Sequence, residues 1–345
     1  MSDNQNQNSD RWQALDAIKT LGLLGAFSAH IVIWWFGKNL DPASGAVFFN
    51  LNGIPNWLIV MYIIVVHFIL ISAGAALYFY LRRKPSLEKI SLRIALLILL
   101  GVLFGLNLQP FFVFWNVFLL YAFSLLIIFI IDHYGNEKII FYVTFCALVV
   151  TPFLRLFLNN IAPGNYWSAI LVGDLQGRIS FYPFFPWFFL IGAGFFTSYF
   201  YSKHQSKHLL TYGICGGIVT LLAAFPFLKP LDFSNIFGVT SQIPLSYIIF
   251  IFGFFVFLIS LLELIFKKIT LSKYNPAIAI GRHILPVYLI TVVITLPLTN
   301  ILKNSAKYGK SIYIFLGLEF ITFLIAYLSG AILTYRSGNS TERPN

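Results

Sequence analysis

The stretch that decides the fold of this chain is residues 244–266, PLSYIIFIFGFFVFLISLLELIF, in which Glu263 is the only charged residue. A helix needs about 20 mostly apolar residues to cross the hydrocarbon core of a bilayer, and this run is long enough to do so. The whole chain of 345 residues is 59% hydrophobic and only 10% charged, with a mean hydropathy of +0.82. Lipid, not water, is therefore the main solvent for this protein.

Apolar runs of this length recur along the chain, separated by short breaks with polar residues, Gly or Pro. They predict an all-α bundle of about ten transmembrane helices in a single domain, residues 11–335, between polar tails at 1–10 and 336–345. The first run begins near Ala17 and lacks a small-residue cleavage site, so we expect a retained helix and not a signal peptide. The predicted spans are residues 17–37, 57–81, 91–109, 113–132, 138–158, 184–201, 208–226, 244–266, 283–302 and 311–334.

Positive charge predicts the orientation of these helices. An even number of spans puts both termini on one side, and Lys and Arg are enriched in cytoplasmic loops. The ninth loop, with Lys303, Lys307 and Lys310, is an exception to the pattern, but the majority predicts cytoplasmic N- and C-termini. The same bias accounts for most of the net charge of +11 without a nucleic-acid partner. The basic residues of the second, sixth and eighth loops are Arg82, Arg83, Lys84, Lys89 and Arg93; Lys203 and Lys207; and Lys267, Lys268, Lys273 and Arg282.

Two outer loops, residues 38–56 and 159–183, are longer than a connection between helices requires, and long loops are often functional. Within the second loop, Asp174 and Arg178 are four residues apart. They form either a local salt bridge or part of an acceptor site, and their spacing fits both. Cys146 and Cys215 lie within apolar runs, so we expect neither a disulfide framework nor a cysteine metal site.

Ionisable residues inside spans are costly and usually face a bundle interior or a cavity, which makes them functional candidates. His30 and His67 both lie about 21 Å from the predicted cytoplasmic ends of their helices, at Asp16 and Leu81, so the two imidazoles are expected at one depth. A neutral imidazole can accept a proton near neutral pH. Equally, each histidine can simply hydrogen-bond a neighbouring helix. No third ligand matches them in spacing, so we expect no metal site.

Other charged residues sit near predicted helix ends. Asp16 and Lys19 are three residues apart and therefore share a helical face, either as an anchoring ion pair or with a functional role. Arg82, Arg83 and Lys84 suit the phosphates of a cytosolic nucleotide-like donor, although loop charge that sets topology explains them as well. In the last third of the chain, Glu263 and Glu319 lie within apolar runs.

The first span resembles the start of a known group of membrane acyltransferases. It reads Arg11-Trp-Gln-Ala-Leu-Asp16-Ala-Ile-Lys19, then an apolar run and His30. This is similar to the acyltransferase-3 family and to the catalytic domain of heparan-α-glucosaminide N-acetyltransferase, in which Arg, Leu-Asp and Arg-Gly precede a helix carrying His or Asn. Here Lys19-Thr20 replaces Arg-Gly. The outer loop 38–56 also lacks the histidine that eukaryotic members keep there.

Three further motifs extend the resemblance over nearly the whole chain. Residues 182–187, Tyr-Pro-Phe-Phe-Pro-Trp, followed by Gly192 and Gly194, look like the proline-rich start of the sixth helix in the bacterial branch of that group. Residues 281–288, Gly-Arg-His-Ile-Leu-Pro-Val-Tyr, are similar to its Gly and Leu-Pro-x-Tyr motif at the ninth helix. Residues 72–74, Ser-Ala-Gly, with Arg82 and Arg83 beyond them, match the second helix more loosely.

The resemblance implies a ten-helix acyltransferase that takes an acetyl or other acyl group from cytosolic acyl-CoA. Its acceptor would be an amine or hydroxyl of an extracytoplasmic saccharide. His30 would be the general base or, alternatively, a transient acyl carrier, with Asp16 as the second catalytic residue. The other residues implied are Arg11, Lys19, Arg82 and Arg83 for the CoA, and His67, Asp174, Arg178 and Trp187 for the substrate.

The sequence is also compatible with two other functions. In a proton-coupled transporter or flippase, His30 and His67 would relay protons and the outer loops would gate a cavity. If the change to Lys19-Thr20 disables the donor site, the protein would only bind its ligand. The compact chain fits a bacterial inner membrane, and its apolar helix faces are compatible with a homodimer among lipid contacts.

Overall fold

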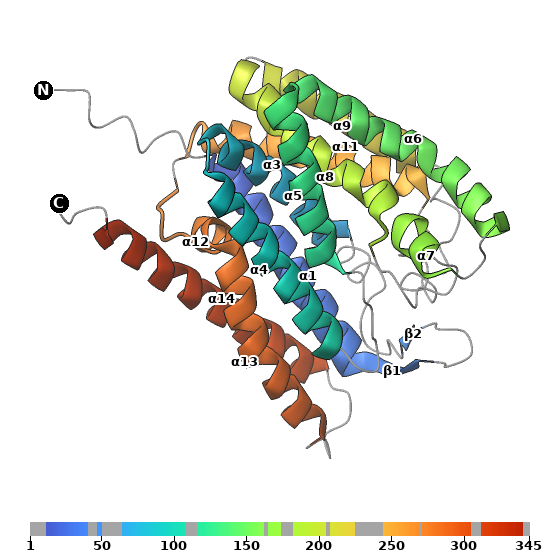
Figure 1. Cartoon of the computed structure of the whole chain (residues 1–345). Helices are drawn as coiled ribbons and strands as arrows, with labels where there is room; N and C mark the ends of the chain where they lie inside the picture. Colours follow the sequence, from blue (N-terminus) through green and yellow to red (C-terminus); the bar gives the residue numbers. More distant parts are fainter. Residues whose placement is uncertain are drawn as a thin grey trace, which may run out of the picture. The chain divides into compact units, whose positions relative to one another are not determined.

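The computed structural model describes most of the chain as helices (Figure 1). A short antiparallel ribbon joins β1 (Gly37–Leu40) to β2 (Val47–Phe49), with Leu40 opposite Val47. Residues 38–56 were predicted as a long loop, because strands of four and three residues are too short to give a clear signal in the sequence. The predicted all-α class is confirmed, apart from the ribbon. The described residues are 12–40, 47–49, 64–107, 116–161, 165–173, 182–204, 208–224, 244–269, 271–304 and 312–340.

Each predicted span overlaps one helix among the described residues. Six of the described helices are long and apolar enough to cross a membrane, or seven if the bent pair α12 and α13 counts as one span, so the chain is an integral membrane protein. This is fewer than the ten spans expected. Two of the remaining helices differ from a typical span. Helix α4 carries Glu88, Lys89 and Arg93 in its first two turns, and α9 has only 16 residues. The longer helices are α1 (Gln13–Phe36), α3 (Phe68–Arg82), α4 (Leu87–Asn107), α5 (Val117–Tyr134), α6 (Glu137–Ile161), α8 (Phe184–His204), α9 (Leu209–Ala224), α11 (Leu245–Phe266), α13 (Ile284–Asn304) and α14 (Ile312–Ser340).

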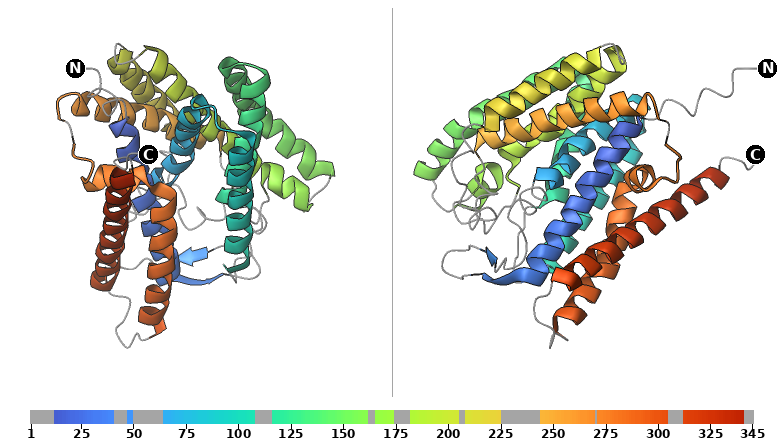
Figure 2. Two further views of the ribbon diagram at one scale, coloured as in Figure 1. Left: turned by 60° about the vertical axis from the view of Figure 1, so that its left-hand side comes forward. Right: turned by 180° about the vertical axis from the view of Figure 1, so that it is seen from behind.

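The chain separates into two compact units. Unit 1 comprises Met1–Phe36, Leu51–Ile69 and Leu258–Asn345. In it α1 packs against the short helix α12 (Pro276–Arg282), α13 and α14, and the last two run side by side in Figures 1 and 2. Phe27 of α1 stacks on Tyr288 of α13 with ring centroids 5.6 Å apart. Unit 1 thus joins the first predicted span to the last two.

Unit 2 comprises Gly37–Asn50 and Leu70–Phe257. Helix α8 lies at its centre, packed against α5, α6 and the short helix α7 (Tyr166–Val172), while α4 pairs with α5. Asn116 caps α5 and also donates from Nδ2 to the Gly101 carbonyl of α4 at 2.7 Å, which fixes that pair. The aromatic side chains of Trp187, Phe188 and Phe195 are almost completely buried in α8.

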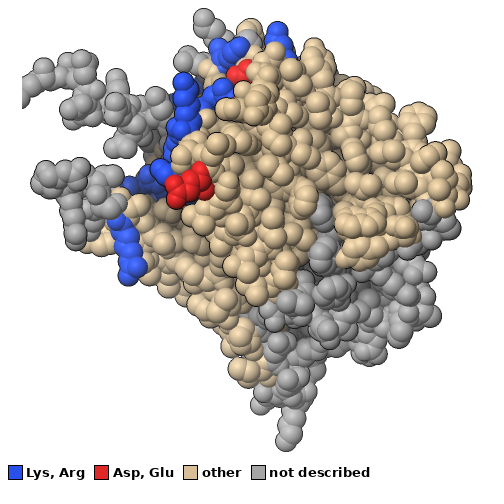
Figure 3. Space-filling view, viewed as in Figure 1, with Lys and Arg blue, Asp and Glu red and all other residues tan. Residues whose placement is uncertain are grey.

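The outward faces of the helices remain apolar. Along α4, exposed leucines at positions 92, 96, 99 and 103 form one helical stripe. On the face seen in Figure 3, Lys, Arg, Asp and Glu occupy few places and uncharged side chains cover the rest of the described surface. A surface of this composition is expected where the helices contact lipid.

Candidate functional site

A close backbone contact joins α1 to α12 in unit 1. A Cβ added to Gly281 would lie 1.8 Å from the main-chain oxygen of Asp16, so only glycine fits at this crossing. One turn along α1, the Thr20 hydroxyl donates to the Ala277 carbonyl at 2.7 Å. Thr20 replaces the expected glycine of the acyltransferase pattern, and here its hydroxyl ties the two helices together. We call Asp16, Lys19, Thr20, Ala277 and Gly281 the α1–α12 junction.

The first turn of α1 is held to the same part of unit 1. Trp12 donates from Nε1 to Glu263 Oε2 at 2.9 Å. Gln13 binds the backbone of Leu271 twice, donating from Nε2 to its carbonyl at 3.2 Å and accepting its N–H at 3.3 Å. These contacts join residues about 250 positions apart, and they fix the orientation of α1 where Asp16 and Lys19 begin.

Asp16 and Lys19 form the ion pair that their spacing predicted. Lys19 Nζ lies 3.3 Å from Asp16 Oδ1, and the two side chains are only 12% and 3% exposed. Removing either partner would leave an uncompensated buried charge, which is strongly destabilising. The pair places one positive and one negative group at the α1–α12 junction.

A further polar contact in unit 1, between α1 and α14, was not predicted. The Ser28 hydroxyl of α1 donates to Glu319 Oε2 of α14 at 2.7 Å. Glu319 Oε1 is buried and accepts no hydrogen bond among the described residues. Glu319 was noted in the sequence only as an ionisable residue within an apolar run, because hydropathy carries no signal for its partner on a helix 291 positions away.

The structure describes the side chain of only one of the two candidate histidines. His30 lies in α1, but its side chain falls outside the described part of the structure. His67 is 2% exposed and lies at the turn before α3, where its backbone N–H donates to the Ile64 carbonyl at 3.3 Å. Its burial suits a packed histidine that binds a neighbouring group. The expectation that both imidazoles share one depth stays a prediction.

Three other predicted site residues lie outside the described residues. They are Arg11, which precedes α1, and Asp174 and Arg178, which follow α7. Arg155 of α6 donates from Nε to the Val172 carbonyl at the end of α7, at 3.0 Å. Arg155 was not among the predicted site residues, and its hydrogen bond holds the end of α7 to α6.

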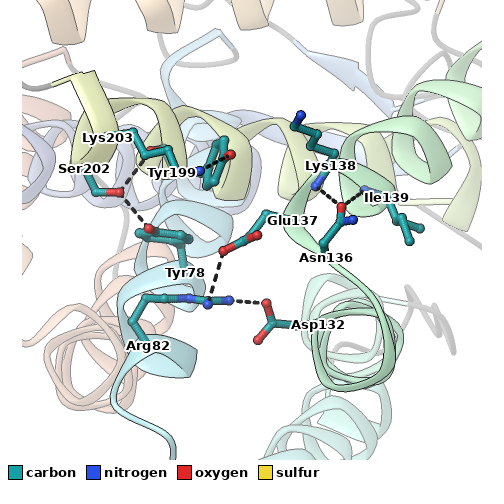
Figure 4. A network of polar contacts seen from close by, with 10 residues as sticks. All are labelled: Tyr78, Arg82, Asp132, Asn136, Glu137, Lys138, Ile139, Tyr199, Ser202 and Lys203. Atoms are coloured by element: carbon teal, nitrogen blue, oxygen red, sulfur yellow. Dashed lines mark hydrogen bonds and ion pairs between the residues drawn. The ribbon is translucent and has the colours of Figure 1, made fainter.

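Arg82 of α3 is part of a polar network in unit 2 (Figure 4). Its guanidinium binds the carboxylate of Asp132, lies 3.3 Å from Glu137 Oε1, and sits over the ring of Tyr78 with its Cζ 5.3 Å from the centroid. The Tyr78 hydroxyl is in turn 2.6 Å from Ser202 Oγ of α8. The network joins α3, α5, α6 and α8 at one end of each helix.

This network changes the expected role of Arg82. The sequence assigned it to CoA phosphates, but two carboxylates already neutralise its charge, and a phosphate would have to displace them. Arg83, the neighbouring candidate, is exposed. Arg82, although 39% exposed, is thus already bound to two carboxylates of unit 2, and the role of phosphate ligand stays a prediction for both arginines.

Trp187 of α8 was expected to bind substrate, but its side chain is completely buried. Tyr182 packs edge-on against it with ring centroids 5.2 Å apart. Burial raises the pKa of the Tyr182 phenol from its ordinary value of 10.0 to about 12. A completely buried indole cannot contact a saccharide in this conformation, so Trp187 belongs to the core of unit 2.

No group of three His, Cys, Asp or Glu side chains able to hold a metal ion occurs among the described residues. The segments that resemble the membrane acyltransferases contact one another in pairs. The Asp16 segment packs on Gly281 in unit 1. In unit 2, Gly74 of α3 packs on the backbone of α8 and Gly194 of α8 packs on the backbone of α3. Comparisons of the chain with protein-family models, curated proteins and solved structures find no match.

Proposed function

We propose that the protein is a membrane acyltransferase that moves an acetyl or other acyl group from cytosolic acyl-CoA to an amine or hydroxyl of an extracytoplasmic saccharide. The observation that supports this best is the α1–α12 junction. Two segments that separately resemble the same acyltransferases, near Asp16 and near Gly281, lie in direct backbone contact although 265 positions separate the two residues (281 − 16). Segments that serve one site are expected to meet in this way.

In the proposed reaction the acceptor oxygen or nitrogen attacks the thioester carbonyl. His30 removes the acceptor proton as the new bond forms. The carbon–sulfur bond then breaks, and the CoA thiolate leaves and takes up that proton. Asp16 and Lys19 lie at the cytoplasmic end of α1 in the proposed topology, where Lys19 would contact a CoA phosphate while Asp16 holds its ammonium group.

The test uses purified protein in detergent and acetyl-CoA as the probe. A ligand that binds only the folded state raises the midpoint of thermal unfolding by mass action. We expect a saturable rise with acetyl-CoA that is reduced in Lys19→Ala. Lys273→Ala is the matched control, because Lys273 is an exposed lysine of unit 1 that contacts Tyr274. No rise at saturating acetyl-CoA in the intact protein would sink the proposal.

Catalysis is tested in proteoliposomes with labelled acetyl-CoA outside or inside the vesicle and amino sugars as acceptors. His30→Ala should abolish transfer and leave the acetyl-CoA thermal shift in place. Full transfer by His30→Ala would exclude it as the base. A bacterial inner membrane, with both termini in the cytoplasm, is the location this reaction would need.

A proton-coupled transporter is the second candidate. It is favoured by the bend of 96° between α12 and α13, since discontinuous helices often form the substrate site of transporters. Flux of a solute driven by a pH gradient, in vesicles without any CoA, would support this function. Acetyl transfer without such flux would favour the acyltransferase.

A further inference from the structure

The contact between Ser28 of α1 and Glu319 of α14 stands apart from the residues assigned above. Glu319 lies within the candidate span Leu316–Ser337, and its side chain meets Ser28 inside unit 1. Ser28 lies eight residues before the end of α1 at Phe36, and Glu319 lies seven residues after the start of α14 at Ile312. Both distances correspond to about 11 Å of helix, so the two groups lie at a similar depth from their helix ends.

The surroundings of Glu319 do not stabilise a negative charge well. Ser28 supplies one hydrogen bond, to Oε2, at 2.7 Å. Oε1 is buried, and Glu319 forms no ion pair among the described residues. An unpaired carboxylate in hydrocarbon is costly, whereas a neutral carboxylic acid can be buried with one or two hydrogen bonds.

The charged pair of α1 lies away from this contact along the helix. Asp16 and Lys19 are already paired, and Lys19 lies nine positions from Ser28, about 14 Å along α1. His30 follows Ser28 by two positions. The ionisable residues of α1, α12, α13 and α14, with the residue between α12 and α13, are Asp16, Lys19, His30, Arg282, His283, Tyr288, Lys303, Tyr313, Glu319, Tyr327, Tyr335 and Arg336.

We infer that Glu319 and Ser28 form a proton-binding site within the membrane-spanning part of unit 1. In the protonated state Oε1–H is a donor and Oε2 accepts the Ser28 hydroxyl. In the ionised state both oxygens are acceptors and Ser28 is the described donor. Uptake or release of one proton therefore changes the strength of the hydrogen bond that joins α1 to α14. This inference does not depend on acyl transfer and applies equally if the protein is a transporter.

The experiment uses dicyclohexylcarbodiimide on the purified full-length protein in detergent. This apolar reagent adds to a protonated carboxyl, and the adduct rearranges to a stable N-acylurea that retains all atoms of both reactants. We expect peptide mapping by mass spectrometry to find the label on Glu319, with labelling that falls as pH rises. Glu319→Gln should lose this label. Glu263→Gln should keep it, because Glu263 is a second carboxyl of unit 1 in an apolar helix, and it accepts from Trp12.

A second variant tests the role of Ser28. The Ser28 hydroxyl stabilises the ionised carboxylate, so Ser28→Ala should extend labelling of Glu319 to higher pH. An unchanged pH profile in Ser28→Ala would overturn the assignment of the pair. Absence of label on Glu319, or a label that does not depend on pH, would overturn the proton site itself.

Infrared spectroscopy provides a readout that needs no reagent. A protonated carboxylic acid has a carbonyl stretch distinct from that of a carboxylate, and the band shifts in heavy water. We expect such a band to be lost in Glu319→Gln and retained in Glu263→Gln. If the band is absent from the intact protein across the pH range in which it stays folded, Glu319 is ionised and the inference fails. Acetyl transfer, measured separately, would be unaffected by that result.

Discussion

Gly74 of α3 and Gly194 of α8 pack reciprocally against each other's helices. A Cβ on Gly74 would lie 1.8 Å from the Ile191 carbonyl oxygen, and a Cβ on Gly194 would lie 1.8 Å from the Ile71 carbonyl oxygen. Neither backbone can retreat without separating the two helices. Close approach through small residues is a common way to associate helices in a membrane, where burial of apolar surface between helices gives little driving force.

We therefore expect Gly74→Ala and Gly194→Ala each to destabilise unit 2 by about 3 kcal/mol, near the upper end of the usual cost of overpacking. Gly317→Ala is the control, because a Cβ at Gly317 would meet no atom within 4 Å. That variant should be neutral or more stable by up to about 1 kcal/mol, as alanine favours helix. The midpoint of unfolding in detergent measures all three, and equal midpoints would contradict the described contact.

The α1–α12 junction gives a second prediction. Thr20→Val removes the hydroxyl that donates to the Ala277 carbonyl, and we expect it to lower the free energy of unfolding by about 1 kcal/mol. Thr20→Ser keeps a hydroxyl and should retain most of that stability. Thr197→Val is a matched control, because that hydroxyl binds the Ala193 carbonyl within its own helix. If both valine variants lose the same stability, Thr20 contributes nothing specific between helices.

Substitution of Arg82 should mainly lower stability, whereas substitution of Arg83 should mainly weaken the binding of acetyl-CoA. Arg82→Ala leaves Asp132 and Glu137 without their shared cation, and because the Arg82 side chain is 39% exposed we expect a loss of only about 1 kcal/mol, weakened by salt. Arg83→Ala should leave stability within about 0.5 kcal/mol and reduce the thermal shift with acetyl-CoA. An Arg82→Ala variant of unchanged stability that no longer responds to acetyl-CoA would restore the original assignment of Arg82 to phosphate.

Burial of the Tyr182 phenol should make the protein less stable at high pH. Its pKa is raised to about 12 by burial, whereas the phenol ionises near 10.0 when unfolded. Between these values unfolding releases a proton, so stability is complete below pH 10 and falls by about 3 kcal/mol as pH rises to 12. Tyr182→Phe should flatten this decline, and Tyr313→Phe, at a residue 81% exposed, should not. Identical profiles in both variants would rule Tyr182 out as the cause.

The helix positions were predictable because hydropathy alone determines which segments leave water. Residues 113–132 and 184–201 were expected as spans, and α5 (Val117–Tyr134) and α8 (Phe184–His204) cover nearly the same residues. The Asp16–Lys19 pair was predictable too, since helical spacing places the residues on one face. Local rules of this kind need no knowledge of the tertiary structure.

Contacts between distant segments were not predictable in the same way. Ser28 with Glu319 and Thr20 with Ala277 join residues more than 250 positions apart, and neither hydropathy nor charge encodes which helices become neighbours. The role of Arg82 also depended on such contacts. Its loop position suggested a free cation, whereas Asp132 and Glu137 approach it only in the folded unit.

The glycines at these crossings restrict how the sequence can drift over evolutionary time. At Gly74, Gly194 and Gly281 any other amino acid brings a Cβ within 2 Å of a backbone oxygen, whereas most lipid-facing positions accept many apolar residues. Homologous chains could therefore lose nearly all recognisable identity in their apolar surfaces and still keep these three glycines in order. Their spacing offers a sparse signature with which distant homologues can be sought.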